Sequence, residues 1–164
     1  MLKGKAFKFG NDVSTDLIIP GKYAQIRSNL PELAKHVMED ADPTFVNRVK
    51  AGDFIVGGKN FGLGSSREHA PIVIKMAGVS AILAKSVARI FFRNAINIGL
   101  PVLICDTDKI NDGDVLEVDL EASTIKDLTN GNVLTFGKIP DVMLRILNEG
   151  GLLDYIQKYG DIKV

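Results

Sequence analysis

Apolar runs and helical patterns alternate along the first two thirds of the chain. Four short segments predict strands: residues 5–9 alternate between polar and apolar, and apolar runs lie at 54–56, 79–83 and 101–105. Helical patterns lie at 30–39, 71–77 and 88–98, and a glycine, which commonly ends a helix, follows each of the last two. This rhythm of strand and helix is typical of an α/β fold.

The segment between the first two strands has a less regular pattern. The apolar triplet 17–19 predicts a further strand, which Pro20 ends because proline lacks the N–H group that pairing needs. The polar stretch 22–29 is expected to form an exposed loop.

The pattern changes in the last third of the chain. Residues 115–120 alternate strictly between apolar and polar, as a half-exposed strand does. Turn signals at 111–113 and 130–132 flank this strand, so the region 106–137 is predicted to be antiparallel. An amphipathic helix is expected over 141–159, with an interruption at Gly150-Gly151. Residues 1–164 are expected to form a single domain.

The charge balance narrows the choice of partners. Twenty basic and twenty acidic residues cancel, so no long-range field attracts nucleic acid or an anionic membrane. No apolar run reaches the length of about 20 residues that spans a bilayer, and the first residues do not resemble a signal peptide. We therefore expect a cytoplasmic chain that binds neither nucleic acid nor membranes.

Cys105 is the one cysteine of the chain, and it ends an apolar run. We expect a buried core thiol, and the alternative is a redox or catalytic thiol. One cysteine can neither form an internal disulfide nor supply the thiolates that an iron–sulfur cluster needs.

The densest chemistry lies in the glycine-rich segment 57–70. It combines four glycines with Ser65, Ser66, Arg67, Glu68 and His69. One interpretation is a capping box, in which Ser65 and Glu68 cap a helix reciprocally. We favour a helix that starts near Ala70 with Pro71 at its first position, because a start at Ser65 would put this proline in the second turn. The preceding backbone N–H groups are then available to an anion.

Three better-known motifs do not fit the glycine-rich segment. A phosphate-binding P-loop requires Gly-Lys-Ser/Thr, whereas Gly64 precedes two serines. A dinucleotide fingerprint requires a small residue where Arg67 stands, and the Gly-x-Ser-x-Gly nucleophile elbow is missing.

Three motifs carry a family resemblance that extends over residues 3–161. They are Thr15-Asp16-x-Ile18-Ile19-Pro20, Gly58-x-Asn60-Phe61-Gly62-x-Gly64-Ser65-Ser66-Arg67-Glu68-His69-Ala70 and Ala88-Arg89-Ile90-Phe91-x-Arg93-Asn94-x-x-Asn97-x-Gly99. With these motifs the chain resembles the small subunits of the isopropylmalate dehydratases, which are aconitase-like hydro-lyases. The resemblance implies a swivelling β/β/α domain of three layers, like the aconitase C-terminal domain.

The resemblance also implies roles for individual residues. Ser65 matches the general base that removes a proton next to a substrate carboxylate. Ser66 and Arg67 match groups that bind a substrate carboxylate, for which the guanidinium fork is suited. Asp16 matches an active-site aspartate that orients charged neighbours, and the alternative for it is a turn cap.

In relatives, the loop after the Ile-Ile-Pro motif discriminates between substrates. Apolar residues there suit isopropylmalate, and an arginine suits a longer tricarboxylate. In this chain Ile26 is suited to a branched alkyl group, Arg27 to a third carboxylate, and Gln25 fits neither pattern. His36 is expected to have no role.

Four polar residues of the motifs have no assigned catalytic role. Glu68 and His69 are expected to support the site, and Arg89 and Arg93, which share a helix face, to have a structural or subunit-contact role.

The resemblance implies one half of a two-chain enzyme. The expected reaction interconverts 2-isopropylmalate and 3-isopropylmalate in leucine biosynthesis, on a [4Fe-4S] cluster held by the large subunit. The alternatives are a related dehydratase acting on homoaconitate, citramalate or 2,3-dimethylmalate, or a non-catalytic module for assembly and dicarboxylate binding. Other hydroxy di- or tricarboxylates, and a homo-oligomer of the isolated chain, stay open.

Overall fold

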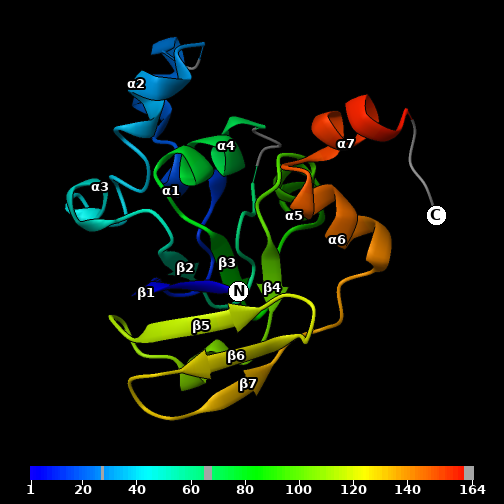
Figure 1. Ribbon diagram of the computed structural model, residues 1–164. Coiled ribbons are helices and arrows are strands. Elements are labelled where there is room, and N and C mark those ends of the chain that lie inside the picture. Colours follow the sequence, from blue (N-terminus) through cyan, green and yellow to red (C-terminus); the bar gives the residue numbers. More distant parts are fainter. Residues whose placement is uncertain (27, 65–67, 161–164) are drawn as a thin grey trace.

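The computed structural model describes residues 1–26, 28–64 and 68–160, and its strands form one seven-stranded sheet (Figure 1). The strands are β1 Leu2–Lys8, β2 Phe54–Val56, β3 Ala81–Ala84, β4 Val102–Ile104, β5 Val115–Asp119, β6 Thr124–Asp127 and β7 Val133–Thr135. Their order across the sheet is β4-β3-β2-β1-β5-β6-β7. The strands β1 to β4 pair in parallel, and β5 to β7 are antiparallel, β5 against β1. The predicted division into a parallel and an antiparallel part is confirmed.

Helices occupy the connections between the parallel strands, part of the connection from β4 to β5, and the end of the described chain. They are α1 Thr15–Ile18, the 3₁₀ helix η1 Gly21–Ile26, α2 Leu30–Ala34, α3 Phe45–Arg48, α4 His69–Met76, α5 Arg89–Asn97, the 3₁₀ helix η2 Thr107–Lys109, α6 Asp141–Asn148 and α7 Leu152–Tyr159. The last two replace the single helix expected over 141–159, and they meet at the predicted interruption.

Alternating side chains of the parallel strands fill two separate cores. On β2, Ile55 packs into one core with the helices α1 to α5, while Phe54 and Val56 pack into the other. The second core also contains Ile125 of β6 and Leu134 of β7. Because strands from opposite ends of the sheet share this core, the sheet is curled over on itself. The layers are therefore helices, parallel strands and antiparallel strands, which confirms the expected β/β/α architecture.

The segment between β1 and β2 differs from the prediction. Residues 17–19 do not form a strand, because the Ser14 hydroxyl accepts a hydrogen bond from the Leu17 N–H at 3.2 Å and caps α1. The helix η1 overlaps the stretch expected as a loop. The helix expected over 30–39 ends at Ala34, and Met38 adopts a left-handed φ of 60° further on.

Cys105 is buried in the second core, as predicted. Burial raises the pKa of its thiol to about 12, because the thiolate would lose its hydration there. The thiol therefore stays protonated at neutral pH, which argues against a nucleophilic role. Within the described ranges, no helix combines the length and the apolar character needed to cross a bilayer.

The turn that precedes β2 approaches β1 closely at Gly4. A Cβ atom on Gly4 would lie 2.2 Å from the backbone oxygen of Gly52, so Gly4→Ala is expected to lower the free energy of unfolding by about 1–3 kcal/mol. Urea denaturation measures this change. Gly10→Ala is the matched control, because its Cβ would have no neighbour within 4 Å. Equal stability of the two variants would contradict the prediction.

Candidate functional site

The glycine-rich segment 57–64 leaves β2 and crosses the carboxyl end of the parallel strands. Its first residue is bonded to β3 and to η2: the Gly57 N–H donates to the Leu83 carbonyl of β3 at 2.7 Å, and the Thr107 hydroxyl of η2 donates to the Gly57 carbonyl at 2.7 Å. The Gly58 N–H donates to the Gly10 carbonyl at 3.1 Å, beyond the end of β1. Open sheets with parallel strands usually bind ligands at this edge.

Asn60 links the turns that follow β1 and β3. Its backbone N–H donates to the Ser86 hydroxyl at 2.8 Å, and its side-chain amide donates to Asp12 Oδ1 at 2.9 Å. The residue has a φ of 60°, a left-handed conformation that asparagine tolerates better than most side chains. The loop is thus held on two sides through one residue.

Gly62 and Gly64 bring the end of the segment against α1 and α5. Gly62 has a φ of 79°, and a Cβ there would lie 2.3 Å from the Phe91 ring. Gly64 has a φ of 110°, and the Thr15 N–H donates to the Leu63 carbonyl at 2.9 Å. Only glycine permits both the conformation and the close approach.

The three residues to which the main roles were assigned, Ser65, Ser66 and Arg67, lie outside the described residues. The chain resumes at Glu68, which occupies the N-cap position of α4 and whose side chain forms no capping hydrogen bond. The helix begins at His69, close to the predicted start. The alternative capping box depends on Ser65 and so falls outside the described residues. Pro71 is the third helical residue instead of the first, but still in the first turn, where a backbone N–H has no intrahelical partner.

Asp16 lies in the first turn of α1, exposed, one residue after Thr15. Helix α1 contacts α4, which follows residues 65–67, and it bonds Leu63, which precedes them. Asp16 therefore lies on a helix that contacts the chain on both sides of 65–67. The alternative role as a turn cap is wrong, because Ser14 performs the capping.

The other predicted substrate contacts lie in η1. Gln25 is exposed, whereas Ile26 is half-buried and packs against the first core. Part of the Ile26 side chain is therefore already covered by the protein. Arg27 lies outside the described residues.

A clamp that the sequence did not reveal fixes η1 to the turn after α2. The Tyr23 and His36 rings stack with centroids 3.9 Å apart, and His36 Nδ1 lies 3.6 Å from Glu39 Oε2. The hydrogen bond from Tyr23 to Glu39 raises the pKa of Tyr23 to about 12 and lowers the pKa of Glu39. His36 was expected to be unremarkable, and the structure gives it this structural contact. No periodic signal connects these residues, so only the fold reveals the clamp.

The site can hold an anion but offers no metal centre in the part of the chain that the structure describes. No three His, Cys, Asp or Glu side chains there are arranged to hold a metal ion. The glycine-rich loop instead leads to the N-terminus of an eight-residue helix, where backbone N–H groups and the helix dipole favour negative charge.

Comparisons with known proteins agree with this geometry. The aconitase C-terminal domain family matches residues 18–106. A crystal structure of 3-isopropylmalate dehydratase from Methanocaldococcus jannaschii aligns with a TM-score of 0.92 at 47% identity, over 97% of this chain and 95% of that one. Fold and loop together therefore define an aconitase C-terminal domain.

Two relatives are similar over nearly their whole length. The 3-isopropylmalate dehydratase small subunit 2 of Archaeoglobus fulgidus is 63% identical over 98% of both chains. The isopropylmalate/citramalate isomerase small subunit of M. jannaschii is 54% identical over 96% of this chain and 95% of the relative. The chain belongs to the family of 3-isopropylmalate dehydratase small subunits, hydro-lyase components that work with a large subunit. The resemblance inferred from the motifs is confirmed.

The clamp on η1 can be tested without any activity. Tyr23→Phe keeps the stacked ring but removes the hydroxyl that donates to Glu39, so amide hydrogen exchange in 21–26 is expected to accelerate several-fold. Tyr159→Phe is the control, because the Tyr159 hydroxyl also bonds a glutamate, Glu149, at 3.3 Å but lies in α7. Unchanged exchange in η1 would show that the hydrogen bond does not hold it.

Proposed function

We propose that this chain, as a single swivelling domain in the cytoplasm, supplies one half of the active site of a two-chain hydro-lyase. The reaction interconverts 2-isopropylmalate and 3-isopropylmalate in leucine biosynthesis. The observation that carries the proposal is the glycine-rich loop, which neighbouring turns hold at the carboxyl edge of the parallel strands and which leads directly into the N-terminus of α4.

Ser65 is the proposed general base, and it takes the proton from the carbon next to a substrate carboxylate. A serine hydroxyl is a weak base at neutral pH, so its deprotonated form needs positive charge close by. Arg67, two residues further on, can supply that charge and bind a carboxylate through its two parallel N–H groups. Ser66 can hold a carboxylate through its hydroxyl or backbone N–H, and Asp16 orients the charged groups.

The residues of this chain do not fit an iron–sulfur cluster. The chain has one cysteine, and its thiol is buried with a raised pKa, whereas a cluster requires several exposed thiolates at one point. The membership of the aconitase-like class implies a cluster in the assembled enzyme, and we assign it to the large subunit.

Citramalate is a second candidate substrate. The relative from M. jannaschii is named as an isomerase for both isopropylmalate and citramalate. Citramalate carries a methyl group in place of the isopropyl group, and the two differ mainly in the apolar contact they need. Ile26 of η1 is half-buried, so its remaining surface can serve either alkyl group. Assays of the reconstituted pair with each substrate show whether the enzyme is specific for isopropylmalate or accepts both substrates.

Removal of the Ser65 hydroxyl tests the central assignment. In the complex with the large subunit, Ser65→Ala is expected to lower kcat by about 100- to 10,000-fold, the usual contribution of a general base. Assembly with the large subunit should be unchanged, and size-exclusion chromatography measures it. Ser66→Ala is the matched control, and it should mainly raise KM.

Two results would contradict the proposal in different ways. Turnover by Ser65→Ala within a few-fold of the unmodified complex would remove Ser65 as the base. Absence of turnover by the unmodified pair with every hydroxy diacid, together with dicarboxylate binding, would favour the non-catalytic module.

A further inference from the structure

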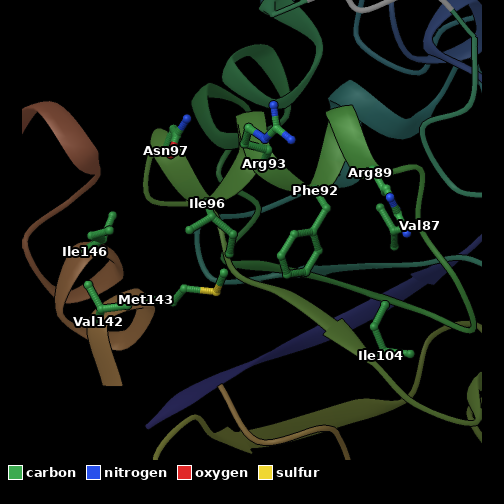
Figure 2. A pocket seen from close by; sticks show the side chains of 10 residues that line it. All are labelled: Val87, Arg89, Phe92, Arg93, Ile96, Asn97, Ile104, Val142, Met143 and Ile146. Carbon is green, nitrogen blue, oxygen red and sulfur yellow. The ribbon is translucent and has the colours of Figure 1, made fainter. Parts of the chain in front are cut away.

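An apolar groove lies between α5 and α6, separate from the glycine-rich loop. It has a volume of about 500 Å³, and Figure 2 shows Phe92, Ile96 and Met143 pointing into it. Its other apolar walls are Val87, Ile104, Val142 and Ile146. Ile104, at the sheet edge, is 40% exposed. Exposed apolar surface of this kind typically marks an interaction site.

A row of polar side chains borders this α5–α6 groove. Arg89, Arg93 and Asn97 follow one another at four-residue intervals along α5, and Figure 2 shows them along this helix above the apolar side chains. Within the described residues, neither arginine forms an ion pair or a side-chain hydrogen bond. Two guanidinium groups thus face solvent beside an apolar floor, without a carboxylate of their own chain.

The two arginine charges indicate that the partner of the groove carries carboxylates. Arginine binds carboxylates through two parallel N–H groups, and it is enriched in protein interfaces. Residues four apart on a helix are separated by a rise of about 6 Å, so Arg89 and Arg93 match two carboxylates one helical turn apart on a facing segment. The chain has no net charge, so this local pair is what attracts an acidic partner.

The groove is continuous with the edge that carries the candidate site. Val87 lines the groove and also pairs with Phe61 of the glycine-rich loop, and the Ala88 N–H donates to the Phe61 carbonyl at 2.9 Å. A segment lying in the groove therefore ends beside the loop. A large subunit that completes the site must cover the same edge.

We infer that the α5–α6 groove docks a segment of the large subunit that presents apolar side chains flanked by carboxylates. The inference rests on the proposed function in one respect, the identity of the partner. It assigns Arg89 and Arg93 to docking and gives neither of them a role in the chemistry.

Charge reversal on the groove tests this inference with the purified large subunit. Arg89→Glu/Arg93→Glu is expected to weaken binding by about tenfold or more, because it sets like charges against each other. Met143→Glu on the groove floor should weaken it as well. The control Lys109→Glu/Lys126→Glu makes the same change of charge at exposed positions of η2 and β6, which contribute nothing to the groove, and it should bind normally. Circular dichroism checks that each variant is folded.

Titration of activity separates docking from catalysis. With the arginine variant, half-maximal activity should require about tenfold more small subunit, while kcat at saturation returns to near the unmodified value. A lasting loss of kcat at saturation would overturn the docking role and make the arginines part of the chemistry. Unchanged binding by the arginine variant would overturn the inference and leave the proposed function intact.

Two further outcomes concern the partner. If the unmodified chain forms a dimer that Arg89→Glu/Arg93→Glu dissociates, while large-subunit binding is unchanged, the groove joins two copies and the inference is wrong. If the unmodified chain does not bind the large subunit at all, both the inference and the two-chain function fail.

Discussion

Main-chain hydrogen bonds between the glycine-rich loop and the turns beside it are the constraint on which the site depends. These bonds use backbone groups of the loop, so the sheet and its turns fix the conformation of the loop without a ligand. Space limits the same residues: a Cβ on Gly58 would lie 2.0 Å from Asn11 Oδ1, and one on Gly57 would lie 2.5 Å from the Phe61 ring. The loop is therefore preorganised as far as Gly64, and the cost of ordering it is met during folding.

Much of the fold was predictable because the parallel strands are buried on both faces. Such strands appear in the sequence as short apolar runs between helical patterns, and β2 and β4 were recognised in this way. The short segment 17–19 was misjudged, because its apolar residues suit a strand or a single helical turn equally well. The Ser14 cap stabilises the helix, and a residue is recognisable as a cap only when the helix that follows it is known.

The site was predictable in part. The glycine pattern identified the loop, since each glycine serves a turn or a close approach that no other residue can make. The clamp of Tyr23 with His36 could not be found, because the two rings meet through a turn of irregular backbone. The α5–α6 groove was equally hidden, since its walls come from helices far apart in the sequence. Arg89 and Arg93 were recognised as one face, but the apolar floor beside them belongs to the tertiary structure.

Phe92 connects regions that have so far been described separately. Its ring points into the α5–α6 groove, and the same side chain packs against both cores. The groove floor therefore includes a residue that also contributes to the packing of both cores. Because a ligand that binds only the folded chain stabilises that state as a whole, a segment seated against Phe92 would raise the melting temperature of the entire domain. The free small subunit would then be the less heat-resistant form, and assembly itself would protect it.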